Sequence, residues 1–288
     1  MTDLIPSHFL TPTKNRIFDD FKAEFEAGNI GLYLAKAESP EQAMVSINAQ
    51  STFYPASLCK LFYLACFLSK VEQKELVADD EDWRAVDNMV SLSSNDATSY
   101  VLNRLCNTST GATLTEPQLT PWIEKRKSVQ RWLATHCPQI SPKQYHLYHA
   151  TFDESPYGRD QQARDILGSN QLSPLACAQM MASLFLDENL LPDHLTKTKR
   201  LLSKNSGQNR FSFDGVDQVT QFIGGALPKG ATYWSKAGWT SQVKHETAYV
   251  FLGDCDCYVM SIFTQGEALV DDAKLFSELT QFLVGEIE

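Results

Sequence analysis

Strand-like segments gather at the two ends of this 288-residue chain, and helical segments fill its middle. The strand-like runs are rich in β-branched and aromatic residues and lie at 30–37, 43–49, 231–238, 246–253 and 257–265. A sheet built from both chain ends, with a helical lobe inserted between its halves, satisfies this order economically. The sequence therefore predicts an α/β (α+β) sandwich: an antiparallel sheet flanked by helices, with an inserted all-helical lobe.

Apolar residues at helical spacing predict the helices of this arrangement. The predicted helices are 14–28, 80–90, 95–106, 118–135, 173–187, 195–204, 216–223 and 267–287, together with an apolar helix that begins near Ser57. Residues 138–172 show no sustained period, and such a stretch is too long for an ordinary connection, so we expect a functional loop there. We expect one compact unit with the active site between an α/β lobe (1–56 with 226–288) and a helical lobe (57–225).

The charge and composition exclude several classes of protein. A net charge of −10 argues against a nucleic-acid binder, because contacts to phosphates need clustered Lys and Arg. No apolar run reaches the roughly 18 residues of a membrane span, and the chain does not start with a signal-peptide pattern. The seven cysteines cannot all pair, so a reducing cytoplasm is the simpler location, although a periplasmic or secreted chain trimmed of its leader would look the same. We expect a monomer that acts on a small-molecule or peptide-like substrate.

The first candidate for chemistry is a serine three residues before a lysine, in the segment YPASLCKLFYLACFL. Ser57 would lie at the N-terminus of a buried apolar helix, with Lys60 one turn later on the same face. Burial lowers the pKa of a lysine, so a neutral Lys60 could take the hydroxyl proton of Ser57. The alternative is an N-cap serine followed by a lysine whose ammonium extends to solvent.

Two further polar motifs follow this segment. SSN at 93–95 precedes a predicted helix, where it supplies either capping side chains or a proton relay beside Lys60. SKAGW at 235–239 ends a predicted strand, and its glycine leaves room for a close approach by another segment. The alternative for this second motif is an exposed lysine at a sheet edge.

In their order along the chain, the three motifs match the S-x-x-K, S-D-N and K-T-G set of penicillin-recognising serine enzymes. The chain resembles the class A β-lactamase-like family, of the β-lactamase and DD-peptidase fold, from the helix near its start to the final helix. SKAGWTSQVKHETAYV (235–250) looks like a K-x-G-W-x-x-x-x-R-H-D-A variant of that family. YGR (157–159) and LGSNQLSP (167–174) look like the matching loop.

The resemblance implies a serine acyl hydrolase that uses no metal or cofactor. It makes Ser57 the acylated nucleophile, Lys60 its base and Ser93 a proton shuttle. Around the substrate it places Asn95 as an amide ligand, Lys236 as an anchor for a carboxylate and for Ser93, and Gly238 as a further substrate-binding residue. The backbone N–H groups of Ser57 and Trp239 would form an oxyanion hole. Lys244 or His245 would supply a further positive charge.

The chain departs from the family at two motif positions, where Ser94 replaces an aspartate and Ala237 replaces a threonine. It also departs from the family in the residue expected to carry out deacylation. Class A enzymes use a glutamate in an E-x-x-L-N loop to activate the water that breaks the acyl-enzyme, and this sequence has no such motif. Glu154 is the best positional candidate, and Asp153 and Asp160 are weaker ones. If none of them reaches the water, the enzyme would acylate and stall, or would hydrolyse a different ester or amide.

The predicted function is therefore hydrolysis of a β-lactam or a related amide or ester through an acylated serine. The alternatives are a DD-peptidase or esterase with little lactamase activity, and a penicillin-binding-like sensor that acylates without turnover. A Cys59 hydrolase is less favoured, because a thiol so close to a helix start packs into the core. A zinc site from Cys255, Cys257, His146 and His149 is also less favoured, because it lacks the usual ligand spacing.

Overall fold

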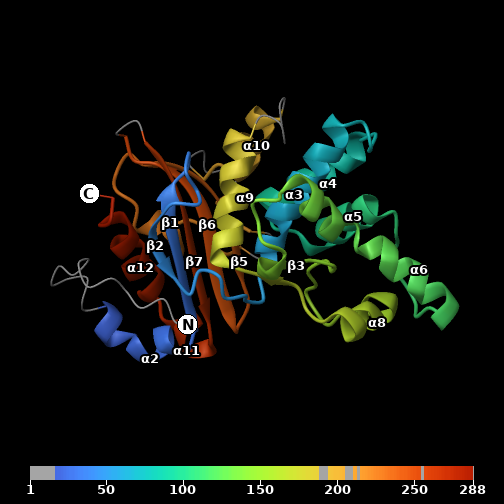
Figure 1. Cartoon of the computed structure of the whole chain (residues 1–288), viewed down its shortest axis with the longest axis horizontal. Helices are drawn as coiled ribbons and strands as arrows, with labels where there is room; N and C mark the ends of the chain where they lie inside the picture. Colours follow the sequence, from blue (N-terminus) through green and yellow to red (C-terminus); the bar gives the residue numbers. More distant parts are fainter. Residues whose placement is uncertain (1–16, 188–193, 205–209, 213–214, 254–255, 288) are drawn as a thin grey trace.

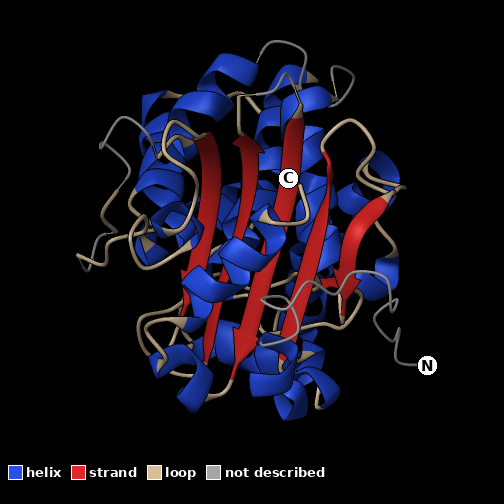
Figure 2. Ribbon diagram, turned by 90° about the vertical axis from the view of Figure 1, so that its left-hand side faces the viewer, coloured by secondary structure: helices blue, strands red, loops and turns tan. Residues whose placement is uncertain are grey.

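The computed structural model describes residues 17–187, 194–204, 210–212, 215–253 and 256–287. A five-stranded antiparallel sheet joins the two ends of the chain (Figure 2). Its strands are β1 (Ile30–Lys36), β2 (Ala43–Ile47), β5 (Thr232–Trp239), β6 (Val243–Phe251) and β7 (Cys257–Gln265). The order is β2-β1-β7-β6-β5, so β1 pairs with β7 and β5 lies at an edge. The predicted sheet from both chain ends is confirmed.

Helices cover both faces of the sheet (Figure 1). Those on one face are α11 (Glu267–Asp271) and α12 (Leu275–Val284), near the short α2 (Lys22–Glu26), and α9 (Pro174–Leu186) packs on the other. Side chains along a strand alternate between the faces. In β7, Met260 and Ile262 belong to the apolar core with α12, whereas Val259 and Phe263 belong to the core with α9. The same alternation decides which side chains of β5 and β6 turn toward the site.

α3 (Cys59–Glu72) is the central helix of the helical region. Every residue from Cys59 to Ser69 is buried, as expected of a helix that is apolar nearly all round. The elements around it are α4 (Asp80–Ser91), α5 (Asn95–Cys106), α6 (Glu116–Arg126), α7 (Ser128–His136), α8 (Gly158–Leu167) and α10 (Leu195–Leu202). α9 contacts both α3 and the sheet, so one continuous core joins them. No helix in the described part of the chain is long and apolar enough to cross a membrane.

Some predicted helix boundaries are wrong. The predicted helices 118–135 and 267–287 are each two helices, α6 with α7 and α11 with α12. Residues 216–223 form a turn, because Asp217 Oδ1 accepts hydrogen bonds from the backbone N–H groups of Val219 and Thr220 (2.9 and 3.1 Å). This side-chain bonding competes with a helix. The 310 turn η3 (Ile223–Gly225) follows.

The segment 138–172 is more regular than predicted. It contains the 310 turn η2 (Pro142–Gln144), α8, and the short strands β3 (Tyr145–His146) and β4 (Gln171–Leu172), which pair with each other. The buried residues of α8 are Gly158, Asp160 and Ala163. α8 therefore has no apolar stripe by which its sequence could have been recognised as a helix.

Candidate active site

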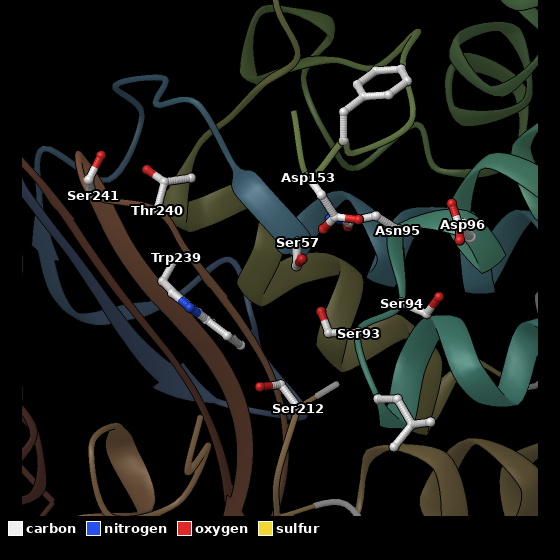
Figure 3. Close-up of a pocket in the computed structure, with 12 residues that line it drawn as sticks. Ser57, Ser93, Ser94, Asn95, Asp96, Asp153, Ser212, Trp239, Thr240 and Ser241 are labelled. Carbon is white, nitrogen blue, oxygen red and sulfur yellow. The ribbon is translucent and has the colours of Figure 1, made fainter. Parts of the chain in front are cut away.

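Ser57 lies in the 310 turn η1 (Ala56–Leu58), which leads directly into α3. Ala56 has φ +45°, a left-handed conformation that costs a non-glycine residue about 1–2 kcal/mol. The buried side chains of Ala56 and Leu58 and a hydrogen bond from Leu58 N–H to Pro55 O (3.0 Å) hold this turn. Such strain tends to collect at functional sites, where the surrounding structure maintains it. Ser57 is half-buried and lines a pocket (Figure 3).

Lys60 is fully buried and joins the polar residues of the site. Its Nζ donates to Ser57 Oγ (2.8 Å), to Asn95 Oδ1 (2.9 Å), and to the backbone oxygen and Oγ of Ser93 (2.5 and 3.2 Å). Because an ammonium has three hydrogens, these contacts include shared bonds. The structure thus brings Ser57, Lys60, Ser93 and Asn95 together, and the ammonium of Lys60 does not extend to solvent.

Ser93 lies between two helices in a second strained turn. α4 ends at Ser91 and α5 begins at Asn95, with Ser94 as its cap, accepting from Ala97 N–H (3.2 Å). Ser93 itself has φ +59°. Of this tripeptide, Ser94 has the capping role, whereas Ser93 and Asn95 bond to Lys60. The capping alternative is thus seen at Ser94, and the proton relay through Ser93 stays a prediction.

Lys236 reaches Ser93 from the sheet. It is fully buried, and its Nζ donates to Ser93 Oγ (3.0 Å) and to the backbone oxygen of Ala237 (2.9 Å). Burial, followed by the nearby charges of Lys60 and Lys204, holds the pKa of Lys236 well below its usual range. The lysine is therefore not an exposed residue of a sheet edge.

Gly238 allows β5 to lie directly against the turn that carries Ser57. A Cβ at this position would lie 2.8 Å from both Ser57 N and Pro55 O, which is closer than side-chain atoms approach. The predicted close approach at this glycine is confirmed. Trp239 follows it and lines the pocket, with its ring 5.6 Å from that of Phe222.

The pocket has a volume of about 490 Å³ and is mostly polar (Figure 3). Its lining residues are Ser57, Leu92, Ser93, Ser94, Asn95, Asp96, Phe152, Asp153, Ser212, Trp239, Thr240 and Ser241. All but Ser212 come from the turn before α3, the α4–α5 junction, the 138–172 segment and the end of β5 with the residues just after it. Lys60 and Lys236 lie beneath this lining and donate to its serines.

The three carboxylates considered for deacylation lie in different surroundings. Asp153 lines the pocket, and its Oδ1 accepts from Asn95 Nδ2 (2.5 Å). Glu154 is exposed and is not one of the lining residues. Asp160 is buried in an ion pair with Arg126 (2.7 Å), which anchors α8. The ranking of Glu154 above Asp153 therefore finds no support in the structure.

Lys244 and His245 do not contribute positive charge to the pocket. Lys244 Nζ lies 5.1 Å from the ring centre of Phe222, on the α12 side of the sheet. His245 is fully buried, and burial lowers its pKa to about 4. Its Nδ1 accepts from Thr264 N–H (3.2 Å), so Nε2 carries the proton and donates to Tyr54 O (3.0 Å). His245 instead supports the loop before Ser57.

The cysteine and zinc alternatives gain no support. Cys59 is fully buried, and burial raises the pKa of its thiol to about 11, far from that of a nucleophile. Within the described residues, no group of three or more His, Cys, Asp or Glu could hold a metal ion. Cys255 lies outside the described residues. His149 Nε2 hydrogen bonds Gly168 O (2.8 Å).

Several residues near the site were not predicted from the sequence, among them Thr151 and Ser212. Thr151 Oγ1 donates to Asn95 Oδ1, the oxygen that also accepts from Lys60. Ser212 lines the pocket. Neither belongs to a periodic or motif-like segment, so only their position in the fold identifies them.

Comparisons with known proteins agree with this geometry. A model of the β-lactamase enzyme family matches residues 13–83 and 83–287. A β-lactamase from Sphaerobacter thermophilus has 15% identity and a TM-score of 0.62, with 93% of this chain and 96% of that chain covered. A class A β-lactamase from Mycobacterium abscessus has 14% identity and a TM-score of 0.64, with 96% and 99% covered.

A mutant of PBP-A, solved as an acyl-enzyme complex with penicillin G, is also similar in structure. It has 16% identity and a TM-score of 0.65, with 99% of each chain covered. No match was found among curated protein sequences. The structural likenesses establish the fold, and the family model covers nearly the whole chain. The chain belongs to the β-lactamase enzyme family.

Proposed function

We propose that the chain is a serine hydrolase that is acylated at Ser57 by a β-lactam or a related amide or ester, and that it then hydrolyses the acyl-enzyme. The observation that carries the proposal is the bonding of Lys60, whose Nζ lies 2.8 Å from Ser57 Oγ and 3.2 Å from Ser93 Oγ. These contacts support the proposal, because Lys60, as the proposed base, touches both the proposed nucleophile and the proposed proton donor. The substrate would bind in the pocket between the helical lobe and the edge of the sheet.

Acylation would start when a neutral Lys60 takes the proton of Ser57 Oγ as this oxygen bonds to the substrate carbonyl carbon. The carbonyl electron pair moves onto oxygen. The backbone N–H groups of Ser57 and Trp239 would stabilise this oxyanion, together with the N-terminus of α3. The contact of Gly238 with the Ser57 turn supports this role, because it brings the strand that carries Trp239 against the backbone of Ser57.

The leaving group would depart on the side of Ser93. Breaking the C–N bond leaves an electron pair on nitrogen, which takes a proton from Ser93 Oγ. Lys60, which holds the proton from Ser57, then returns one to Ser93. Lys236, 3.0 Å from Ser93 Oγ, would supply the positive charge for a substrate carboxylate. Asn95 Nδ2 would exchange its bond to Asp153 for a bond to the substrate amide.

We assign deacylation to Asp153 in place of Glu154. Asp153 lines the pocket and is tied to Asn95, whereas Glu154 is exposed outside the lining. As a general base, Asp153 would take a proton from water while the water oxygen bonds to the acyl carbon. The C–Oγ bond then breaks, its electron pair goes to Ser57 Oγ, and this oxygen takes up the proton that Asp153 removed from the water, which restores the free enzyme.

The test is to incubate the protein with nitrocefin and with a fluorescent penicillin. We expect turnover of nitrocefin in the wild-type protein and its loss in Ser57→Ala, with no change in melting temperature large enough to indicate unfolding. Labelling of Ser57→Ala at the wild-type rate would contradict the assignment of the nucleophile. An absence of any reaction in the wild-type protein would contradict a β-lactam substrate.

A second candidate is a protein that binds penicillin covalently and releases it slowly. The observation that favours it is the bond between Asp153 and Asn95, because a carboxylate engaged there is less available to a water molecule. The PBP-A mutant acyl-enzyme shows that a protein of this fold can be held at that stage. A stable fluorescent adduct without nitrocefin turnover would favour this second function, and also a DD-peptidase.

A further inference from the structure

A second cavity adjoins the proposed active site and has no part in the mechanism above. It has a volume of about 630 Å³, compared with about 490 Å³ for the pocket around Ser57. Its described lining comes from the segment before Ser57, α8 and β4, the turn between β5 and β6, and the end of β7. The charged residue of that lining is Arg164, so we call it the Arg164 cavity. A concave site with a few convergent polar groups is a candidate for ligand binding.

The Arg164 cavity adjoins the pocket around Ser57 through two chain segments. Thr240 lines both cavities. Tyr54, which lines the Arg164 cavity, comes three residues before Ser57 in the same segment. A chain attached to a carbonyl group at Ser57 would therefore enter the Arg164 cavity past Thr240.

The Arg164 cavity lies on the acyl side of the proposed reaction. The leaving group would depart beside Ser93 and Lys236, whereas Thr240 and Ser93 lie on opposite sides of Ser57 in Figure 3. Along β5, the chain advances about 10 Å from Lys236 to Trp239 before it reaches Thr240. Arg164 is therefore not a second partner for the carboxylate that Lys236 would hold, and it would meet a different part of the substrate.

Arg164 has hydrogen-bond donors to spare. Most arginines in the described part of the chain form ion pairs with carboxylates, but Arg164, near the end of α8, forms none with a described residue. It donates one hydrogen bond, from Nη2 to Ser169 Oγ (3.2 Å), although a guanidinium carries five N–H groups. Arg164 is half-buried. A planar guanidinium in this state is suited to bind a carboxylate through two hydrogen bonds.

The charges around the two cavities differ in sign. Asp96 and Asp153 line the pocket around Ser57, whereas the described lining of the Arg164 cavity contains no acidic residue. Glu24 accepts from Asn29 Nδ2 (2.7 Å) at the rim but is not one of the lining residues. The whole chain carries a net charge of −10, so this positive cavity is a local exception to its overall charge. An anionic group is therefore favoured in the Arg164 cavity over the pocket around Ser57.

The uncharged lining of the Arg164 cavity suits peptide groups. Four of its side chains are amides, those of Asn29, Gln171, Gln242 and Gln265. Each amide side chain offers both donors and an acceptor, as a peptide group does. Gln265 Nε2 bonds Asn29 Oδ1 (3.3 Å), which fixes two of these amides relative to each other. Such a lining can bind the backbone of a peptide-like chain while Arg164 binds its carboxylate.

A third cavity extends this arrangement. It has a volume of about 400 Å³ and shares Ser169 and Gln171 with the Arg164 cavity. Its described lining adds Lys143, which is exposed, and His146, and it contains no acidic residue. A ligand that continues beyond Arg164 would again meet positive or neutral groups, so the cavities suit an extended ligand.

We propose that the Arg164 cavity is a subsite for the acyl part of the substrate, and that Arg164 binds a carboxylate on this part. The substrate class is then an acidic, peptide-like acyl chain, longer than the side chain of penicillin G. The assignment of the cavity to the acyl part rests on the proposed function. The preference for a carboxylate can also be measured as binding, without any reaction.

The probes are two penicillins that differ at the end of the acyl chain. One carries an adipoyl chain that ends in a carboxylate, and the other carries the same chain ending in a carboxamide. We expect the wild-type protein to be acylated by the carboxylate probe about tenfold faster, because of charge-assisted hydrogen bonds to Arg164. Mass spectrometry of the intact protein over time gives both rate constants.

Three variants test whether Arg164 is the source of this preference. Arg164→Gln should bring the ratio of the two rate constants to about one, and Arg164→Lys should retain about threefold, because a lysine keeps the charge but not the planar fork. Arg159→Gln is the matched control. It removes the same charge from the same helix, but Arg159 bonds Ala112 O (3.0 Å) and does not line the Arg164 cavity. It should keep the wild-type ratio.

A binding measurement separates this inference from the proposed function. Isothermal titration calorimetry with Ser57→Ala gives the dissociation constants of both probes, and we expect the carboxylate probe to bind about tenfold more tightly. This preference in a protein that no penicillin acylates would support the inference and contradict the proposed function. Acylation by both probes at equal rates would support the proposed function and overturn the inference.

Two further results would overturn the proposal. One is a preference for the carboxylate probe that persists in Arg164→Gln, and the other is equal binding of the two probes to Ser57→Ala. If Arg164→Gln does not fold, the wild-type preference must decrease between about 0.05 M and about 0.5 M salt, because salt screens a half-buried ion pair. A preference that does not depend on salt would then overturn it.

Discussion

The two halves of the proposed reaction are built from different kinds of structure. The acylation side comprises Ser57, Lys60, Ser93 and Lys236, on a buried turn, a buried helix and a sheet strand, with both lysines fully buried. The deacylation side is Asp153, an exposed loop residue with a hydrogen bond from Asn95. In the proposed reaction, acylation would depend on the core of the protein, whereas release of the acyl group would depend on a surface loop that can vary without disturbing the core.

Substitutions among the buried acylation residues should abolish both acylation and turnover. Lys60→Met should reduce the rate of acylation by penicillin about a thousandfold or more, because it removes the base and leaves Ser93 with one lysine partner. Stopped-flow fluorescence with a labelled penicillin measures this rate. A loss below tenfold would mean that another group takes the proton of Ser57.

Gly238→Ala should break the contact between the sheet and the nucleophile turn. Its Cβ would lie 2.8 Å from Ser57 N, so the turn must move and the oxyanion donors separate. We expect acylation to slow by about a hundredfold, the typical cost of one lost oxyanion donor. The matched control is Gly28→Ala, at φ +77° and with no atom within 4 Å of its Cβ.

Gly28→Ala should cost about 1 kcal/mol of stability through backbone strain and leave the acylation rate unchanged. Thermal unfolding and the same stopped-flow assay distinguish the two variants. Equal loss of acylation in both would indicate that Gly238 acts only through overall stability.

Substitutions on the exposed side should separate release from acylation. Asp153→Asn should leave the acylation rate within a fewfold of wild type and slow release of the acyl group by about a hundredfold, because the general base is lost. Glu154→Gln should change neither rate by more than about twofold, since Glu154 is outside the pocket lining. Mass spectrometry of the intact protein over time measures both steps. Slower release in Glu154→Gln alone would restore the assignment made from sequence.

Acid should lower the free energy of unfolding, because the buried His245 resists protonation in the folded state. Burial lowers the pKa of His245 to about 4, from an ordinary value near 6.5. As pH falls, the histidine is therefore protonated first in the unfolded chain and only later in the folded one. The folded state loses stability relative to the unfolded state between about pH 6.5 and about pH 4.

The expected loss in unfolding free energy is at most about 3 kcal/mol, and His245→Gln should lose less over the same range. Urea denaturation at pH 7 and pH 4.5 measures this difference. An identical pH dependence in both proteins would contradict a buried neutral His245, which bonds the loop before Ser57 through Tyr54 O.

The sequence predicted the sheet and the buried residues of the site better than the loops. All five strands of the large sheet were predicted, because alternation and β-branched runs are local properties, whereas the short strands β3 and β4 were not. Ser57, Lys60 and the later motifs were recognisable because short spacings place them at helix starts and a strand end. α8 was missed because its contacts are polar, including Asp160 with Arg126.

The local sequence pattern could not predict which side chains point into the pocket. Asp153 and Glu154 are adjacent in an irregular loop, and no periodicity states which of them turns into the pocket. Lys244 and His245 are adjacent in β6 and point to opposite faces, so neither reaches the pocket.

The most direct test of the account is the site and lifetime of the adduct with penicillin. The protein is mixed with penicillin G, quenched at a series of times, and digested for peptide mapping by mass spectrometry. We expect one adduct on Ser57, which forms at comparable rates in wild type and Asp153→Asn and decays about a hundredfold more slowly in Asp153→Asn. An adduct on any other residue, or equal decay in the two proteins, would contradict it.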